Sequence, residues 1–292
     1  MTFAAQDAAS WLANPRATRE TLEAFGLATK HRLGQNFLVE DNIIRKIIRL
    51  AELTSDDVVL EVGPGLGTLT VAMLDYVRAV CSIEADRELE GVLATTCKEP
   101  HQDSFVLCMG DALKATPRLV GDAYASLGVF ADAQGKEASG ALIGPNKFVS
   151  NLPYQVAATL ILLFFQEFAT LEQAVVMVQA EVADRIAAKP GTKAYGAYTA
   201  KLALYAQVSG RFEVAPGNFM PPPRVNSAVV RLERAPMTDP SGTGVLTSEQ
   251  LALAARVIDA AFAQRRKTIR NSMGASGFKK DTLERAFLAA HI

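Results

Sequence analysis

The sequence contains few of the residues that build metal centres and disulfide frameworks. Only three cysteines (Cys81, Cys97 and Cys108) occur among its 292 residues, they form no C-x-x-C pair, and the three histidines are scattered. Each cysteine lies in or beside an apolar segment, so we expect reduced thiols, as in a cytosolic protein. With so few Cys and His residues, a structural zinc site is not expected, and we predict no metal.

Long apolar runs and targeting signals are also scarce. The longest apolar run, at 156–165, is too short to cross a membrane and is typical of a buried helix. The first 16 residues contain no basic region that leads into an apolar core, so no secretory signal is expected. These absences predict a cytoplasmic protein without a membrane partner.

Charge is distributed unevenly, although the formal net charge is only −1. Residues 1–200 carry 17 Lys and Arg against 24 Asp and Glu, a net charge of −7. Residues 201–292 carry 13 against 7, a net charge of +6, and no acidic residue interrupts positions 260–280. The densest basic cluster in this part indicates either a solvated helix face or a surface for a polyanion such as RNA.

Apolar segments alternate with helical patterns over the first two thirds of the chain. Strands are predicted at 58–62, 79–83, 105–109, 147–150 and 173–179, and helices at 68–76, 88–97, 156–167 and from 180. Nearly continuously apolar strands that alternate with helices are typical of a parallel sheet covered on both faces, so we expect an α/β fold. Asn14 and Pro15 predict the start of an earlier helix, and Asp41 is expected to cap a second one.

The end of this alternation predicts the domain organisation. Residues 118–146 contain five glycines and little periodicity, which predicts a flexible surface insertion. The alternation stops near residue 208, and strand-like pieces at 211–214 and 227–233 give way to helices from Ser248 and Asp281. We therefore expect an N-terminal extension at 1–30, a main domain at 31–210 and a smaller, mainly helical C-terminal domain at 211–292.

A glycine-rich turn, G-P-G-L-G at 63–67, follows the first predicted strand. Glycines at the carboxyl end of a parallel strand let a nucleotide-like ligand approach the backbone closely. The spacing is not that of a dinucleotide site, because Thr68 stands where G-x-G-x-x-G needs its last glycine. The chain also lacks the G-K-[S/T] element of a P-loop for ATP or GTP.

Acidic residues follow the next two predicted strands. Glu84 stands 21 residues after Gly63, and a carboxylate there can bind two ribose hydroxyls. Asp111 follows the third strand and can accept a hydrogen bond from an adenine amino group. Either acid alone is equally compatible with a strand end that faces water, but three such features at successive strand ends indicate a cofactor that carries a nucleoside. Because no partner for phosphate charge is evident, the pattern favours S-adenosylmethionine over NAD or ATP.

The tetrapeptide N-L-P-Y at 151–154 ends the fourth predicted strand. It places an amide side chain, backbone carbonyls and an aromatic ring together, and Pro153 stiffens the turn. The exocyclic amino group of a flat base needs such partners, because carbonyl oxygens accept its N–H hydrogens and the ring stacks on the base. A plain strand-to-helix turn is the alternative interpretation.

At these residues the chain resembles the class I methyltransferases, and the tetrapeptide is similar to the motif of their amino-methylating branch. Three further segments narrow the resemblance: H-R-L-G-Q-N-F-L at 31–38, F-M-P-P-P-R-V-N-S-A-V-V at 219–230 and F-A-Q-R-R-K-T-I-R-N at 262–271. With them the chain resembles the bacterial small-subunit (16S) ribosomal RNA adenine dimethyltransferases from about residue 29 to 290. The resemblance implies a Rossmann-like domain with a mostly parallel, doubly wound sheet.

The resemblance also implies which residues act. The expected contacts to the methyl donor S-adenosylmethionine are Asn36, Leu38, Gly63, Gly65, Glu84, Asp111 and Asn151. The target adenine is expected to enter against Asn151, Leu152, Pro153 and Tyr154. Phe219 is either a second stacking surface for the base or a buried core aromatic. The expected RNA-binding residues are Arg224, Arg265, Arg266, Lys267 and Arg270.

The implied reaction is N6,N6-dimethylation of two adjacent adenines in a 3′-terminal hairpin of small-subunit ribosomal RNA, coupled to assembly of the 30S subunit. The expected partner is that RNA within 30S particles, and we expect the protein to act as a monomer. The chain departs from the family pattern in its extension before His31, in His31 itself, where the family has Lys, and in the gap of 40 residues between Asp111 and Asn151.

Two alternatives stay open. One is an antibiotic-resistance methyltransferase that acts on large-subunit RNA, and the segments at 219–227 and 264–271 argue against it. The other is a non-catalytic assembly or transcription factor with the same fold. The intact acids and tetrapeptide of the expected site argue for retained catalysis.

Overall fold

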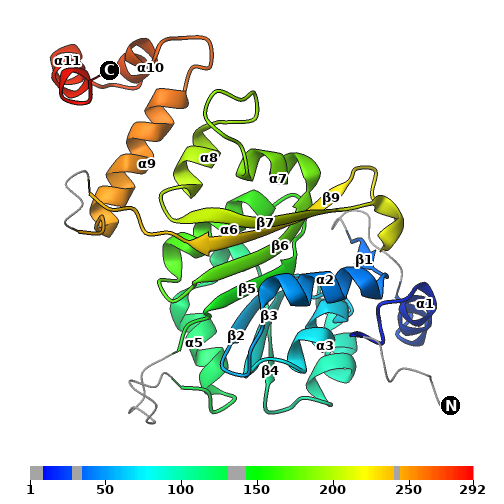
Figure 1. Ribbon diagram of the computed structural model, residues 1–292. Helices are drawn as coiled ribbons and strands as arrows, with labels where there is room; N and C mark the ends of the chain where they lie inside the picture. Colours follow the sequence, from blue (N-terminus) through cyan, green and yellow to red (C-terminus); the bar gives the residue numbers. More distant parts are fainter. Residues whose placement is uncertain (1–8, 28–34, 131–142, 240–243, 292) are drawn as a thin grey trace. The chain divides into compact units, whose positions relative to one another are not determined.

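The structure is a computed structural model that describes residues 9–27, 35–130, 143–239 and 244–291 (Figure 1). The chain divides into two compact units, a larger one with Met1–Ala183 and Val208–Arg234 and a smaller one with Asp184–Gln207 and Ala235–Ile292. The expected boundary after residue 210 differs from this division. The reason is that the strand-forming residues at 208–234 return to the sheet of the larger unit.

Seven strands form one sheet in the order β4-β3-β2-β5-β6-β9-β7 (Figure 1). Neighbouring strands from β4 to β6 pair in parallel, and β9 pairs antiparallel with β6. The strands are β2 (Val58–Val62), β3 (Ala79–Glu84), β4 (Phe105–Met109), β5 (Lys147–Asn151), β6 (Gln173–Gln179), β7 (Ala206–Val214) and β9 (Ser227–Arg234). The mostly parallel α/β sheet predicted from the apolar strands is confirmed.

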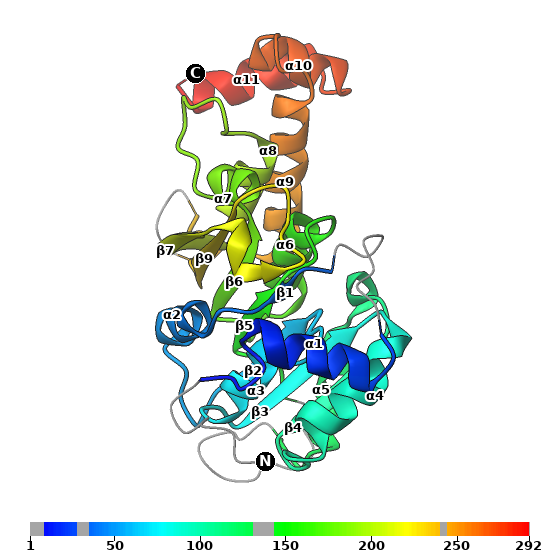
Figure 2. The ribbon, with the colours of Figure 1, turned by 90° about the vertical axis from the view of Figure 1, so that its right-hand side faces the viewer.

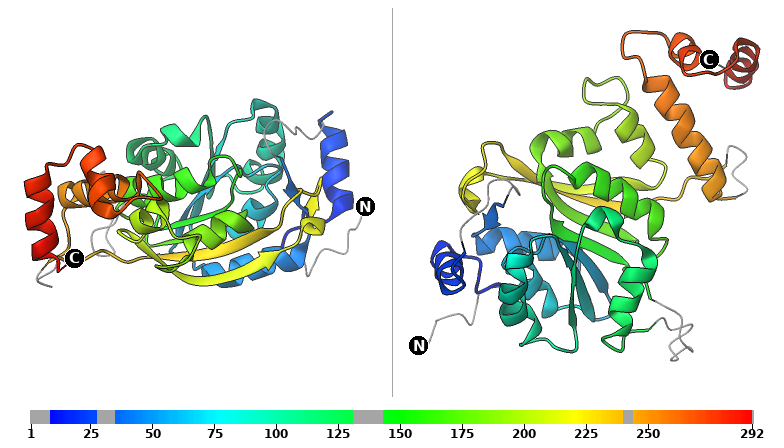
Figure 3. Two further views of the ribbon diagram at one scale, coloured as in Figure 1. Left: turned by 90° about the horizontal axis from the view of Figure 1, so that it is seen from above. Right: turned by 180° about the vertical axis from the view of Figure 1, so that it is seen from behind.

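Helices cover both faces of this sheet, as in a doubly wound fold (Figures 1 and 3). Helices α2 (Asp41–Ala51) and α3 (Thr68–Leu74) lie on one face, where buried isoleucines of α2 pack with Val59, Val80 and Val149. Helices α5 (Pro117–Ala125) and α6 (Ala157–Glu167) lie on the other face. There the ring of Phe148 packs edge-on against Phe164, with the ring centroids 4.9 Å apart.

The segments before and between these elements follow the sequence pattern with local differences. Helix α1 (Pro15–Ala24) begins as predicted, since the Asn14 side chain accepts the Ala17 N–H. The expected cap of α2 was wrong: the capping side chain is Glu40, because Asp41 is instead bonded to the Ser10 N–H and to Arg45. The predicted helix at 88–97 is divided into a 3-10 turn (Arg87–Leu89), α4 (Glu90–Leu93) and a π turn (Ala94–Lys98).

The expected flexible insertion at 118–146 was wrong for its first part, which forms α5. Thr116 caps this helix, Pro117 occupies its first turn, and the fully buried Tyr124 donates its hydroxyl to the Val59 carbonyl at 2.7 Å. At the other end of the segment, the Asn146 amide accepts the Val58 N–H at 2.8 Å. Residues 131–142 lie outside the described residues.

The smaller unit is mainly helical, as predicted, with α8 (Ala197–Leu202), α9 (Ser248–Phe262), α10 (Ile269–Ala275) and α11 (Lys280–Ala289) (Figure 2). Its small core consists of Ala260, Met273, Leu283 and Phe287. Helix α7 (Ala180–Ile186) continues from β6. Within the described ranges, no helix combines the length and the apolarity needed to cross a membrane.

Two cations from the sheet hold the carboxyl end of α2. Nζ of Lys147, the first residue of β5, donates to the carbonyls of Ala51 and Glu52 at 2.7 Å each. Arg231 of β9 donates to the Leu50 carbonyl and to the Glu52 carboxylate. The last carbonyls of a helix lack intrahelical partners and form the negative end of its dipole. Both cations therefore fix α2 to the sheet, and α2 in turn follows the segment that lines the cavity described below.

Replacing Lys147 by Met should destabilise the larger unit, because the change removes a buried cation but keeps most of its apolar stem. The buried Asp57, which lies 3.1 Å from Nζ, would lose its charge partner. We expect the free energy of unfolding to fall by about 3–5 kcal/mol in urea titrations. Arg16→Met, which breaks an exposed ion pair with Glu20, serves as the control and should leave the unfolding midpoint unchanged. Equal effects of the two substitutions would contradict the assignment.

Candidate active site

A cavity opens at the carboxyl ends of β2, β3, β4 and β5, the edge at which a doubly wound sheet binds ligands. All of its lining residues belong to the larger unit. They are residues 35–38, 61–65, 68, 69, 83–85, 89, 110–113, 151–156 and 160. Every residue expected to contact the cofactor, and the whole tetrapeptide at 151–154, lies in this cavity.

The glycine turn after β2 lets two distant segments approach the backbone. Gly63 and Gly65 have φ values of +67° and +63°, in the left-handed region that favours glycine. A Cβ atom on Gly63 would lie 3.3 Å from the ring of Pro153, and one on Gly65 would lie 3.2 Å from the ring of Phe37. The turn is therefore packed closely between the tetrapeptide after β5 and the short strand β1 (Phe37–Leu38), and a side chain at either glycine would force the neighbouring ring to shift.

Glu84 ends β3 in a buried position at the floor of the cavity. Burial raises the pKa of its carboxyl, although the N–H groups of Asp86, Gly65 and Ala85 act in the opposite direction. Asp86 is held in turn by Gln35, whose amide nitrogen donates to Oδ2 at 2.9 Å. A chain of hydrogen bonds thus connects the segment before β1 to the acid at the end of β3.

Asp111 lies at the end of β4 and is exposed at the cavity. Its side chain accepts the Leu113 N–H at 3.0 Å and so caps the 3-10 turn Ala112–Lys114. A carboxylate has several acceptor positions, so this bond leaves capacity for a ligand donor. Leu113 also lines the cavity and is exposed, which places an apolar surface beside the acid.

Glu61, the residue two positions before Gly63, is fully buried beneath the glycine turn and also lines the cavity. Its Oε2 accepts the hydroxyls of Thr70 at 2.7 Å and Ser82 at 2.6 Å. Burial and, to a lesser extent, the charge of Glu84 raise the pKa of Glu61 to about 7, against the opposing effect of both hydrogen bonds. Two interacting carboxyls therefore lie under the same cavity.

Two residues of the tetrapeptide that line the cavity, Asn151 and Leu152, each keep a hydrogen-bond acceptor without a partner among the described residues. The amide nitrogen of Asn151 donates to the Asn36 carbonyl at 3.4 Å, which orients the amide and leaves Oδ1 as its acceptor. The Pro153 carbonyl accepts the N–H groups of Val156 and Ala157, because it takes part in the start of α6. Among the described residues, no hydrogen bond reaches Asn151 Oδ1 or the Leu152 carbonyl.

Tyr154 lines the cavity next to these acceptors. Its hydroxyl lies 2.6 Å from Oγ of Ser227, the first residue of β9. Burial raises the pKa of the Tyr154 hydroxyl, against the effect of the hydrogen bond with Ser227. The ring therefore carries a neutral hydroxyl at neutral pH, which suits a stacking surface.

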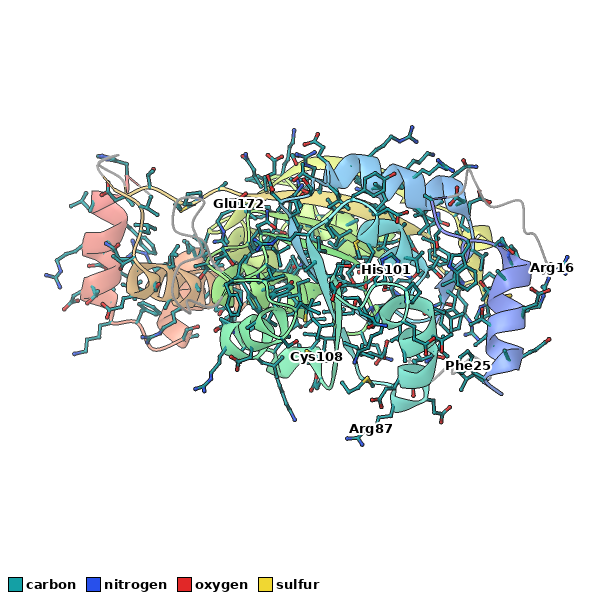
Figure 4. The ribbon with its side chains drawn as sticks, turned by 90° about the horizontal axis from the view of Figure 1, so that it is seen from below. Arg16, Phe25, Arg87, His101, Cys108 and Glu172 are labelled. Atoms are coloured by element: carbon teal, nitrogen blue, oxygen red, sulfur yellow. The ribbon has the colours of Figure 1, made fainter. Side chains whose placement is uncertain are left out.

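The charge of the lining is one-sided. It contains three carboxyl groups and, among the described lining residues, no Lys, Arg or His. Arg87 follows Glu84 closely in sequence, but its side chain points outward into solvent (Figure 4). Such a lining fits a ligand with positive charge better than one with phosphate groups. No cluster of three potential metal ligands occurs in the part of the chain that the structure describes.

The structure does not bring every expected site residue to this cavity. Phe219 is only 3% exposed, lies in the core and does not line the cavity, because the short strand β8 (Phe219–Met220) pairs it with Leu38. Of its two sequence interpretations, the geometry supports the core aromatic. Arg224 is exposed in the loop between β8 and β9.

The expected basic cluster lies in the smaller unit, in and after the turn that joins α9 to α10. Arg265, Arg266 and Lys267 are exposed. Arg270 is also exposed, but it pairs with Glu284 at 3.1 Å, and its guanidinium lies over the ring of Phe287. Arg270 therefore has a structural role in joining α10 to α11, which the sequence did not predict.

A protein-family model described as ribosomal RNA adenine dimethylase matches residues 26–287. The chain belongs to this family. The resemblance drawn from the sequence motifs is confirmed, and with it the enzyme class, a ribosomal RNA adenine dimethyltransferase.

Curated proteins also resemble the chain over nearly its whole length. A protein of Streptomyces griseus subsp. griseus named ribosomal RNA small subunit methyltransferase A is 37% identical, and the match covers 96% of this chain and 88% of that protein. A protein of the same name from Acidothermus cellulolyticus is 38% identical, and the match covers 93% of this chain and 84% of that protein.

Solved structures of the same kind share the fold. A dimethyladenosine transferase from Plasmodium falciparum has a TM-score of 0.61 and 25% identity, covering 81% of this chain and 74% of that one. The 23S rRNA methyltransferase ErmE has a TM-score of 0.60 and 24% identity, covering 88% of this chain and 91% of that one. The latter likeness shows the fold alone.

Three residues of this adenine dimethylase site were missed in the sequence. Glu61 stands two positions before the glycine turn, and Ser227 lies in the segment at 219–230, so both had a motif as a signal. Asp86 had no signal beyond its closeness to Glu84. All three act through hydrogen bonds to residues that lie far away in the sequence, which a linear pattern does not display.

The raised pKa of Glu61 predicts a pH-dependent stability. The pKa of Glu61 is about 7 in the folded state and 4.5 in the unfolded chain, so folding favours the protonated acid. The stability that protonated Glu61 contributes is therefore complete below pH 4.5 and is lost as pH rises through about 7. Because glutamine does not ionise, the stability of Glu61→Gln relative to the wild-type protein should rise by up to about 3 kcal/mol as pH increases from 4.5 to above 7. Denaturant titrations at several pH values test this, and parallel pH curves for the two proteins would refute it.

Proposed function

We propose that this protein methylates N6 of two adjacent adenines in a 3′-terminal hairpin of small-subunit ribosomal RNA, twice on each, with S-adenosylmethionine as donor. It acts as a monomer in the cytoplasm on RNA within 30S particles, coupled to their assembly. The observation that carries the proposal is the pair of acceptors, Asn151 Oδ1 and the Leu152 carbonyl, at the edge of an acidic cavity.

The residues present fit the donor. When bound, S-adenosylmethionine supplies a methyl group made electrophilic by a positively charged sulfonium. Its ribose suits Glu84, its adenine suits Asp111 and the apolar Leu113, and its positive charges suit a lining without basic side chains. Gly63 and Gly65 would let its methionine part approach the backbone, and Asn36 and Leu38 would close the cavity from the segment before α2.

The two acceptors act on the target base. The lone pair of adenine N6 is delocalised into the ring, which makes the amino group a weak nucleophile. When Asn151 Oδ1 and the Leu152 carbonyl accept its two N–H hydrogens, the nitrogen is held pyramidal and its lone pair is localised. The methylated nitrogen is acidic and loses its proton to water, so no side chain is needed as a base. Positioning of reactants can supply about 7–11 kcal/mol of a barrier.

Tyr154 holds the base by stacking. A base that is taken out of an RNA helix loses its stacking partners, which costs a few kcal/mol. Stacking on an aromatic ring returns roughly 1–3 kcal/mol. The turn at Pro153 and the start of α6 fix the backbone that carries this ring.

The basic residues support an RNA partner. Arg265, Arg266 and Lys267 are exposed on the smaller unit, with no acidic residue between positions 260 and 280, so they can meet phosphates. Arg224 is exposed three residues before Ser227, the partner of the Tyr154 hydroxyl, and can contact the backbone of the target strand. The net charge of −7 on residues 1–200 disfavours tight binding to arbitrary RNA, which favours a structured particle as substrate.

The substrate is tested by transfer of labelled methyl groups to unmethylated 30S subunits, with naked small-subunit RNA and 50S subunits as controls. We expect incorporation into the 30S subunits and recovery of N6,N6-dimethyladenosine after digestion. Incorporation only into 50S subunits would show that the proposed substrate is wrong. Binding of the donor without any incorporation would favour an assembly factor that has lost catalysis.

Asn151→Ala should lower the rate of transfer by about 10²–10³-fold, the usual effect of removing one oriented hydrogen-bonding group from an active site. RNA binding should be largely kept, because phosphate contacts dominate it. Asn218→Ala is the matched control: its amide also donates to a backbone carbonyl, Ala215 at 2.8 Å, but Asn218 does not line the cavity. Near-full activity of Asn151→Ala in single-turnover assays would remove the amide from the mechanism.

A further inference from the structure

The bond between Tyr154 and Ser227 connects the cavity to a distant strand. Tyr154 lies in the turn after β5, and Ser227 begins β9, on the other side of β6. Asn151 pairs with Met177 of β6, and Ser227 pairs with Gln179 two residues further along the same strand. The two hydroxyls therefore meet across the end of β6, 2.6 Å apart.

Both ends of the Tyr154 side chain are fixed by this arrangement. Its backbone lies between Pro153 and the start of α6, where the Pro153 carbonyl accepts two helix N–H groups. Its hydroxyl is held by Ser227, which is 0% exposed and is itself fixed by the pairing of β9 with β6. A tyrosine has two side-chain torsions, so fixing both ends leaves the ring little freedom.

Core packing alone does not explain the hydrogen bond between Tyr154 and Ser227. Tyr154 lines the cavity and is only partly buried, whereas the neighbouring core is already filled by apolar residues of β6 and β9. A ring that is ordered before the base arrives does not lose that freedom on binding, and this favours both affinity and reactive geometry. The bond also occupies the Tyr154 hydroxyl, so the ring offers its face rather than a proton-transferring group.

We infer that Ser227 is a positioning residue for methyl transfer, whose hydroxyl holds the Tyr154 ring in the orientation that stacks on the target adenine. The inference rests on the proposed function, since it needs a base bound against Tyr154. Ser227 does not line the cavity, so we expect it to act on the base through the ring. The loop before β9 carries Arg224, and Ser227 is the residue at which this loop joins the sheet.

A double-mutant cycle with Ser227→Ala, Tyr154→Phe and the double variant tests this. One net hydrogen bond is worth a factor of about 2–12 in an equilibrium or rate constant, so each single variant should lower kcat/KM on 30S subunits by that factor. The double variant should lose no more than either single one, because all three lack the same bond. The dissociation constant of S-adenosylmethionine, measured by calorimetry, should stay unchanged in each.

A fluorescent base gives a readout that a merely structural role would not change. With 2-aminopurine at the target position, stacking on the ring quenches the fluorescence, and we expect weaker quenching in Ser227→Ala and Tyr154→Phe. Tyr124→Phe is the matched control, because it also removes a buried tyrosine hydrogen bond, to Val59 at 2.7 Å, but lies outside the cavity. It should lower the unfolding midpoint without changing the quenching or kcat/KM.

The outcomes separate this inference from the proposed function. Additive losses in the cycle, wild-type quenching in Ser227→Ala, or a loss of donor binding equal to the loss of transfer would each overturn the positioning role. If the wild-type protein methylates only 50S subunits, the proposed substrate fails, and the same cycle on 50S subunits then decides the role of Ser227. If it methylates neither particle, both proposals fail.

Discussion

The close approach of two chain segments to the backbone of the glycine turn determines the geometry of the whole site. Pro153 lies against Gly63 and Phe37 lies against Gly65, so closely that a Cβ atom on either glycine would stand only 3.3 Å or 3.2 Å from the neighbouring ring. The turn therefore sets the spacing between the acids at the ends of β3 and β4 and the tetrapeptide at the end of β5. Phe37 in turn pairs with Met220 on β8, which connects this arrangement to the loop that leads to Ser227.

The fold also selects which atoms of the tetrapeptide are available for chemistry. The Pro153 carbonyl accepts N–H groups at the start of α6, and the amide nitrogen of Asn151 donates to the Asn36 carbonyl. These bonds leave the Asn151 amide oxygen and the Leu152 carbonyl as the acceptors beside the cavity. Hydrogen bonds that begin a helix and orient an amide thus determine which acceptors can hold the amino group of the target base.

Much of this was predictable from the sequence, because strand ends and glycine turns are local features. The parallel sheet, the positions of its strands, and the grouping of Gly63, Glu84, Asp111 and the tetrapeptide follow from the alternation of apolar segments. The chain segment at 118–125 was predicted wrongly because Gly121 and the glycines that follow this segment concealed a helix that Thr116 caps. Two features could not be predicted from the sequence: that the Leu152 carbonyl rather than the Pro153 carbonyl is available as an acceptor, and that Tyr154 and Ser227 are hydrogen-bonded. Both depend on contacts that form only in the folded chain.

The central claim is that the paired acceptors hold the amino group of the target adenine. It is tested most directly by a crystal structure of the protein with S-adenosylhomocysteine and the target hairpin of small-subunit RNA, prepared without methyl groups on its adenines. We predict that N6 of the adenine lies about 2.7–3.2 Å from both Asn151 Oδ1 and the Leu152 carbonyl, with the base stacked on Tyr154. An adenine bonded instead to the Pro153 carbonyl, or held outside this cavity, would contradict the claim.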